Sequence, residues 1–358
     1  MSAHGRPIQG DRLRVLQLNV FGRSDPWPER REALRNGLRE LNPDLLALEE
    51  TIVTDDYDQV EDLLGPGYSV CHQSGRADDG TGISLVSRWP LQEVREISLK
   101  VTERAAGFPG AALIARIEAP APIGSLLFVN QKPTWQRGYE HERELQAVAT
   151  AQEIEKLAQD DNVHVVVAGD FDAVPDAASV RFWTGRQSLR RCSVMYRDAW
   201  EAIHGTEEGH TFSPSNPLVT GGDMPLELGR RIDYVLVRAV DHGPTLRIAD
   251  CRLAFAEPVG SVWASDHFGV LADLAPHPCR DRGRPDPTRV RRGRGRVTCG
   301  RGGSTFGQRR SVGMLMPDLD VLPKVIHPIA VRPALDHRAQ DGRILRRRVT
   351  TVEMELPS

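Results

Sequence analysis

Acidic side chains follow an apolar, β-branched run in the middle of this sequence. Asp170 and Asp172 come directly after residues 163–168, at positions i and i+2. The run is typical of a buried strand, so both acids leave a sheet at one end, where the chain turns. Ligand sites of α/β folds gather at such strand ends. Two carboxylates there can hold a divalent cation, orient a water molecule or accept a proton, although a turn with two solvated acids has the same pattern.

Other predicted strand ends carry side chains with similar chemistry. They are Asn19, Glu50 and the neighbours Asp266 and His267. Asp233 is a charge inside an otherwise apolar strand, where it would cost several kcal/mol unless it is paired or hydrogen-bonded. A histidine is a natural partner, because a carboxylate fixes the tautomer of the imidazole and raises its pKa.

The elements that must position these residues alternate along the chain. Apolar residues at three- and four-residue spacing predict helices over 26–41 and 139–159 and near 177–183. Short apolar runs predict strands at 13–20, 44–50, 83–87, 112–117, 125–130, 163–168, 232–237, 246–255 and 268–274. The alternation, with several hairpins, indicates an α/β fold.

Charge is divided unevenly over the 358 residues, whose net charge is −3. Residues 276–358 hold 18 basic and 8 acidic side chains, which leaves 28 basic and 41 acidic ones before them. We therefore expect a polar lead-in over 1–11, one catalytic domain over 12–275 and an Arg/Gly/Pro-rich, disordered tail over 276–358. The tail could contact nucleic acid or be an extension without function.

Other features predict a cytoplasmic, monomeric protein. The number of cysteines, five, is odd, and no CxxC pair occurs, so neither a disulfide framework nor a zinc ribbon is indicated. The first residues lack the apolar stretch of a signal peptide, and no apolar run is long enough to span a membrane.

Taken in order, the segments LNVFG, LALEE, GDFDAVPD, RRIDYVLV and ASDHFGV resemble the endonuclease/exonuclease/phosphatase superfamily, whose fold is that of DNase I. The resemblance extends over about residues 12–274. It implies a four-layer α/β sandwich, in which two packed mixed β-sheets are flanked by helices. It also implies hydrolysis of a phosphoester, either in a small molecule or in nucleic acid, with Mg²⁺ or Mn²⁺ as cofactor.

The resemblance also implies a role for each motif residue. Glu50 looks like the metal-binding glutamate, assisted by Asn19 and Asp266, and Asn19 could also contact substrate. Asp170 resembles the aspartate that orients or deprotonates the attacking water. His267 resembles the histidine that stabilises the phosphorus centre or acts as an acid, with Asp233 as its orienting partner.

Two departures from the family pattern stand out. A histidine usually follows the strand that ends at Asn130; here Gln131 best fits its position, and Lys132, one residue on, is the other candidate and a possible substrate contact. Asp172 stands where the family usually has an asparagine that contacts the phosphate. If Gln131 replaces a proton donor, the loss could cost roughly 10²- to 10⁴-fold in rate. The alternative function is therefore a binding module of the same fold with impaired catalysis.

Overall fold

Two mixed β-sheets form the centre of the computed structural model, which describes residues 12–158, 163–222, 224–277 and 350–352. The first sheet has six strands, in the order β12 (Arg247–Ala254), β13 (Gly269–Ala275), β1 (Leu13–Asn19), β2 (Leu45–Ile52), β4 (Thr81–Ser87) and β3 (Ser69–His72). The second has eight, in the order β11 (Gly243–Pro244), β10 (Asp233–Val240), β8 (His164–Asp170), β7 (Ser125–Lys132), β6 (Ala111–Glu118), β5 (Leu91–Ser98) and β14 (Thr350–Val352), with β9 (Tyr196–Asp198) paired to β10. The pairs β1–β2 and β7–β8 are parallel and most others are antiparallel.

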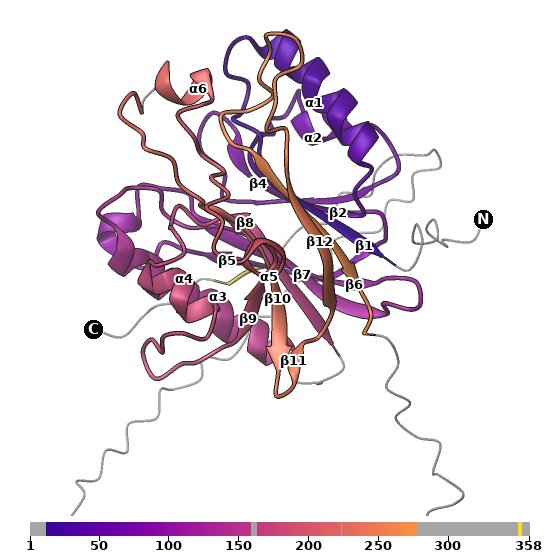
Figure 1. Ribbon diagram of the computed structural model, residues 1–358, viewed down its shortest axis with the longest axis vertical. Helices are drawn as coiled ribbons and strands as arrows, with labels where there is room; N and C mark the ends of the chain where they lie inside the picture. Colours follow the sequence, from indigo (N-terminus) through magenta and orange to yellow (C-terminus); the bar gives the residue numbers. More distant parts are fainter. Residues whose placement is uncertain (1–11, 159–162, 223, 278–349, 353–358) are drawn as a thin grey trace, which may run out of the picture. The chain divides into compact units, whose positions relative to one another are not determined.

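Helices cover the outer faces of the two sheets (Figure 1). The described helices are α1 (Trp27–Leu41), α2 (Gln59–Leu64), α3 (Glu140–Leu157), α4 (Ala178–Trp183), α5 (Ala199–His204) and α6 (Pro217–Thr220). Leu34 of α1 packs in one apolar cluster with Leu16 of the first sheet. Ala151 of α3 and Trp183 of α4 pack in another with Val165 of the second sheet. The layers run helix, sheet, sheet, helix, and the predicted four-layer sandwich is confirmed.

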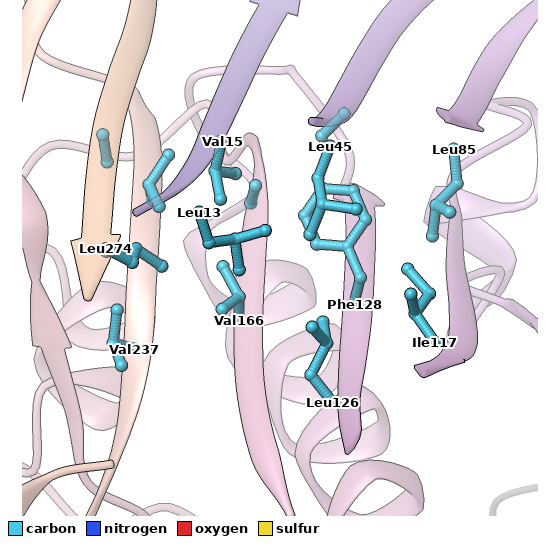
Figure 2. Close-up of a cluster of buried hydrophobic side chains, with 14 of the residues drawn as sticks. Leu13, Val15, Leu45, Leu85, Ile117, Leu126, Phe128, Val166, Val237 and Leu274 are labelled. Atoms are coloured by element: carbon cyan, nitrogen blue, oxygen red, sulfur yellow. The ribbon is translucent and has the colours of Figure 1, made fainter. Parts of the chain in front are cut away.

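Alternate residues of the strands make the apolar core between the sheets (Figure 2). Leu13 and Val15 of β1 lie in one cluster with Phe128 of β7 and Val166 of β8, and none of the four side chains is exposed. Since successive side chains of a strand point to opposite faces, Leu16 belongs instead to the cluster under α1. Each central strand therefore has one face toward the other sheet and one toward helices.

Helix α1 shows how local sequence sets the ends of an element. Pro28 lies in its first turn, where its missing N–H is not needed. Asn42 ends the helix in a left-handed conformation, and its N–H donates to the carbonyl of Leu38. Ala33 and Leu34 supply the buried face. The observed bounds, Trp27–Leu41, agree with the helix predicted for 26–41.

At one end of the sandwich the inward-facing residues change from apolar to polar. They read Leu13, Val15, Gln17 and Asn19 along β1, and Val166, Ala168 and Asp170 along β8. The same change takes Val235 to Asp233 in β10, which runs antiparallel to β8. The apolar core thus closes one end of the space between the sheets, and a polar cluster fills the other.

The structure adds elements that the apolar runs did not predict. Strands β3 and β5 and helix α2 are among them. Residues 350–352 of the predicted disordered tail form β14, which pairs in parallel with β5, so the structure differs from the prediction at these three positions. The β-branched Thr350, Thr351 and Val352 suit an added edge strand. The predictions for 1–11, for 278–349 and for 353–358 lie outside the described residues.

Candidate active site

The ends of β7 and β8 bring a lysine and an aspartate together. The two strands are parallel, with Asn130 beside Ala168, so two residues further on Lys132 lies beside Asp170. Nζ of Lys132 donates to Oδ2 of Asp170 at 2.6 Å. It also donates to Oδ2 of Asp172 and lies 4.0 Å from Oε1 of Glu50. A single ammonium group therefore faces three carboxylates.

A bulge in β2 turns Glu50 toward this cluster. The pairing of β2 with β4 shifts between Leu48 and Thr51, and Glu50 has a φ of 55°. Such an irregularity re-aims a side chain that regular alternation would point elsewhere. Asn19 of β1 connects Glu50 to the opposite sheet, since its Nδ2 donates to Oε1 of Glu50 at 2.8 Å and to Oδ2 of Asp170 at 3.0 Å.

His267 and Asp233 form a hydrogen-bonded pair. Nδ1 of His267 lies 2.9 Å from Oδ2 of Asp233, and its Nε2 lies 3.9 Å from Oδ2 of Asp170. Nε2 of Gln17 donates to the other oxygen of Asp233 at 2.6 Å. The ring of Phe212 packs on the imidazole, with 4.8 Å between the ring centroids. These contacts fix the imidazole with Nε2 on the side of Asp170.

The pKa values reflect burial and an excess of negative charge. Burial lowers the pKa of His267, but Asp233 and Asp170 outweigh it and hold that pKa well above its usual value. Burial opposes ionisation of Asp170 as well, yet the charges of Lys132 and His267 lower its pKa to about 2. Burial and the charge of Asp170 raise the pKa of Asp172 to about 6.

A cavity of about 520 Å³ opens over these groups. Its polar wall includes Glu50, Lys132, Asp172, Asp266 and His267. Its apolar wall includes Phe21, Phe108, Trp135, Leu218 and Met224. The lining thus offers charged groups for a polar part of a ligand and apolar side chains for a larger apolar part.

The donor set fits a hard divalent cation. Five carboxylates meet here, those of Glu50, Asp170, Asp172, Asp233 and Asp266, while two cationic side chains of the described residues bond directly to them, Lys132 and His267. Burial and the nearby charge of Glu50 raise the pKa of Asp266 to about 6. A divalent ion would relieve this excess of negative charge, and carboxylate and amide oxygens are the ligands that Mg²⁺ and Mn²⁺ prefer.

Two groups of residues could hold that ion. Asp170, Asp233 and His267 offer ligand atoms within 4.8 Å of one another. The hydrogen bond between His267 and Asp233 already uses one atom of each. Glu50 and Asp266 instead present carboxylates to the cavity. The Glu50 side therefore has carboxylates open to a ligand, and it is also the side that the family resemblance predicts.

The structure brings most of the predicted site residues together. These are Asn19, Glu50, Lys132, Asp170, Asp172, Asp233, Asp266 and His267. Gln131 is not among them, and its expected place in the site needs correction. It alternates with Leu127 and Val129, which pack under the helices, whereas Lys132 lies on the inward face. Of the two candidates for the histidine's place, Lys132 is therefore the one whose side chain enters the site.

Sequence reasoning missed Gln17 and Glu49. Nε2 of Gln17 donates to Oε2 of Glu49 at 2.8 Å as well as to Asp233, and both Gln17 and Glu49 are fully buried. Burial, followed by the charges of Asp170 and Asp233, raises the pKa of Glu49 well above its usual value. Polar residues at the inward positions of apolar strands were the available signal, but it requires knowing which face is inward.

A family model and a curated protein both match most of this chain. Residues 16–267 match the model of the Endonuclease/Exonuclease/phosphatase family. Sphingomyelin phosphodiesterase 2 of Homo sapiens is 27% identical over 281 residues, which cover 74% of this chain and 64% of that protein. The match thus spans a little under two thirds of the curated relative.

Solved structures share the fold. TDP2 of D. rerio, complexed with a single-strand DNA product, superposes with a TM-score of 0.59 at 21% identity and covers 74% of this chain and 98% of that one. A mannosyl-6-phosphatase of Bacteroides thetaiotaomicron gives 0.58 at 18% identity, covering 74% and 99%. None of the helices within the described ranges is both long enough and apolar enough to cross a bilayer.

Proposed function

Because the chain belongs to the endonuclease/exonuclease/phosphatase family, we propose that it is a phosphoester hydrolase that depends on a divalent metal, Mg²⁺ or Mn²⁺. The observation that carries this proposal is the meeting of Asp170, Lys132 and the His267–Asp233 pair beside one cavity. In-line attack on phosphorus needs an oriented water, a neutralising cation and a donor to the developing charge. These side chains are of the types that supply such functions.

Asp170 orients the attacking water and accepts its proton. Oδ2 of Asp170 accepts hydrogen bonds from Lys132 and Asn19, and Oδ1 accepts from the backbone N–H of Asp172 at 3.1 Å. These contacts fix the carboxylate plane and favour the ionised form, which a base requires.

His267 donates from Nε2 to the phosphoryl oxygens or to the leaving oxygen. Asp233 fixes the tautomer by accepting from Nδ1, and Gln17 holds Asp233 in turn. Lys132 uses two of its N–H groups on Asp170 and Asp172 and also lines the cavity, so a third can reach a phosphoryl oxygen.

Glu50, Asn19 and Asp266 would hold the divalent ion. When bound, the ion supplies a Lewis acid that withdraws charge from the phosphoryl group and stabilises the leaving oxygen. Asn19 would keep Glu50 in position for the ion, because its Nδ2 donates to Glu50 and to Asp170 of the second sheet.

For the substrate we propose a phosphodiester with an apolar group, of the kind that the name sphingomyelin phosphodiesterase implies for the relative. Phe108, Trp135 and Met224 line the same cavity as Glu50, Lys132 and His267 and would receive that group. Leu226 and Leu228, in the loop that follows Met224, are 88% and 89% exposed. Exposed leucines beside the cavity would suit a substrate held in a lipid aggregate.

The alternative, a binding module with impaired catalysis, was motivated by Gln131 in place of a histidine. Gln131 lies on the helix-facing side of β7, and the side chain that enters the site there is Lys132, a charged donor. The hydrolytic function is therefore the one that we test first.

The test is to incubate the full-length protein with each of four substrates, in the presence of Mg²⁺, Mn²⁺ or EDTA, and to measure hydrolysis. The substrates are sphingomyelin in detergent micelles, bis-p-nitrophenyl phosphate, p-nitrophenyl phosphate and single-stranded DNA. We expect turnover that EDTA abolishes and that Asp170→Asn reduces about 10²- to 10⁴-fold. Asp176→Asn, which changes an exposed acid after the same strand, is the matched control. Turnover that survives both EDTA and Asp170→Asn would contradict the proposal.

The lipid part of the proposal has its own test. Leu226→Ser and Leu228→Ser together should lower turnover of micellar sphingomyelin while turnover of soluble bis-p-nitrophenyl phosphate stays unchanged. The reason is that both leucines are exposed and lie outside the catalytic cluster. An equal loss on both substrates would contradict the role in lipid contact.

A further inference from the structure

Lys132 is an ammonium group enclosed by carboxylates. Its side chain is 8% exposed, and its Nζ bonds to Asp170 and to Asp172, whose own side chains are 0% and 10% exposed. A buried ammonium carries a desolvation penalty of several kcal/mol unless its charge is compensated. Here two direct hydrogen bonds and the carboxylate of Glu50 at 4.0 Å provide the compensation.

The ammonium group of Lys132 also stabilises the ionised forms of the two aspartates. Asp170 and Asp172 are two residues apart, and each would raise the cost of ionising the other. Asp172 has a φ of 51°, so the chain turns sharply enough to direct both carboxylates to one Nζ. Lys132 thus does for this pair what a metal ion does for carboxylates in other sites.

A metal ion cannot share the same place. Nζ lies 2.6 Å from Oδ2 of Asp170, and an Mg²⁺ ion bound by that oxygen would sit about 2.0–2.1 Å from it. Oδ2 also accepts from Asn19, so its lone pairs are already used. The side of Asp266 and Glu50 is different, because both carboxylates line the cavity and Glu50 lies at the edge of the reach of Lys132.

We infer that Lys132, held by Asp172, is a resident cation on the Asp170 side of the site, so that the protein binds one divalent ion, on the Glu50 and Asp266 side, and not two. This inference rests on the proposed function. It assigns the fixed positive charge between Asp170 and Asp172 to the chain itself, and it makes Asp172 the positioning residue of Lys132.

The two departures from the family pattern support this pairing. Lys132 stands where a histidine is expected and Asp172 where an asparagine is expected, and the structure shows that they contact each other. One change adds a positive charge and the other a negative charge. Together they leave the net charge of the site unchanged while fixing a cation inside it.

The experiment counts Mn²⁺ ions per full-length chain by calorimetry and by electron paramagnetic resonance. We expect one ion for the wild type and two for Lys132→Met, which removes the charge but keeps an unbranched side chain. Lys132→Arg should still bind one ion, because the charge remains. Adding Asp172→Asn to Lys132→Met should return the count to one, since a carboxylate of the second position is lost.

Arg31→Met is the matched control, because Arg31 forms an ion pair with Asp62 away from the cavity and its loss should leave the count at one. Thermal unfolding of every variant establishes that it is folded. If Lys132→Met does not fold, Lys132→Gln takes its place. Two ions in the wild type, or one ion of unchanged affinity in the folded Lys132 variant, would overturn the inference.

These outcomes separate the inference from the proposed function. One bound ion without hydrolysis of any phosphoester would count against the proposed function alone. Two bound ions with EDTA-sensitive hydrolysis would contradict only the inference that Lys132 takes the place of a second divalent ion. A wild type that binds no ion would overturn both the metal dependence and the inference.

Discussion

The two ends of β1 carry charged neighbours in opposite balance. At its start, the guanidinium of Arg14 donates to both oxygens of Asp273, at 2.7 and 2.9 Å. Asp44 accepts from the backbone N–H of Arg14 and lies 3.2 Å from Arg88. Each of these two carboxylates therefore has a cationic partner, and Arg12, 3.9 Å from Asp273, adds a further cation. At the other end Asn19 lies among carboxylates that outnumber the cations bonded to them.

The difference separates structural charges from functional ones. A balanced cluster stabilises the fold and needs nothing further. An unbalanced one costs free energy, since burial and mutual repulsion raise carboxyl pKa values, and clusters of shifted pKa are typical of active sites. Three predictions test whether the two ends of β1 differ in this way, and a fourth tests the assigned face of β7.

The largest effect is expected at the unbalanced end. Asp233→Asn should lower kcat/KM about 10²- to 10⁴-fold, because His267 loses the carboxylate that fixes its tautomer and charge. Thermal unfolding should change little, since burial already raises the pKa of Asp233 and a neutral amide removes a buried charge. A large loss of stability with activity retained would contradict the comparison.

At the balanced end the effects should be reversed. Arg14→Met is expected to lower the free energy of unfolding by about 2 kcal/mol, because it leaves the buried Asp273 without its bidentate partner; partial exposure of the pair keeps this below the fully buried range. Urea unfolding measures the change. kcat/KM should match the wild type, and a large fall would show that this end also serves the reaction.

The Arg14–Asp273 pair at the start of β1 should make the stability of the protein depend on pH. The hydrogen bond from Arg14 holds the pKa of Asp273 below its usual value. Its contribution to stability is therefore full above the unfolded pKa, about 3.9, and is lost as the pH falls through the folded pKa. Melting temperatures of the wild type and Asp273→Asn should differ at neutral pH and converge in acid. A constant difference would contradict this.

The smallest effect is expected for Gln131→His. Because Gln131 lies on the helix-facing side of β7, a histidine there cannot reach the phosphoryl group, and kcat/KM should stay unchanged. The assay is hydrolysis of bis-p-nitrophenyl phosphate, with Lys132→His beside it as the inward-facing counterpart. A marked gain in the Gln131 variant would mean that the assigned face is wrong.

The apolar runs predicted an α/β fold, and polar residues marked the strand ends that form the site, while the four-layer sandwich and the residue roles were predicted from the family resemblance. Asn19, Asp170 and Asp266 could be singled out from their places at strand ends alone. Glu50 could be named from its motif, but the bulge that re-aims it depends on pairing with β4, which local sequence does not encode.

The choice between Gln131 and Lys132 could not be made from the sequence, since a shift of one residue exchanges the two faces of a strand. The register of β7 against β8 decides it, and that register is a property of the folded sheet. Gln17 was missed for the same reason. Its polar side chain becomes informative once β1 is known to face Asp233 across the sandwich.

Gly169, between the last valines of β8 and Asp170, has a consequence for how this protein can vary. A Cβ at this position would lie 2.0 Å from the carbonyl oxygen of Gln131, so β7 and β8 could not stay as close as they are. That closeness keeps Lys132 against Asp170. In a saturation scan scored by growth or turnover, position 169 should therefore tolerate as few residues as the catalytic positions, although it offers no functional group.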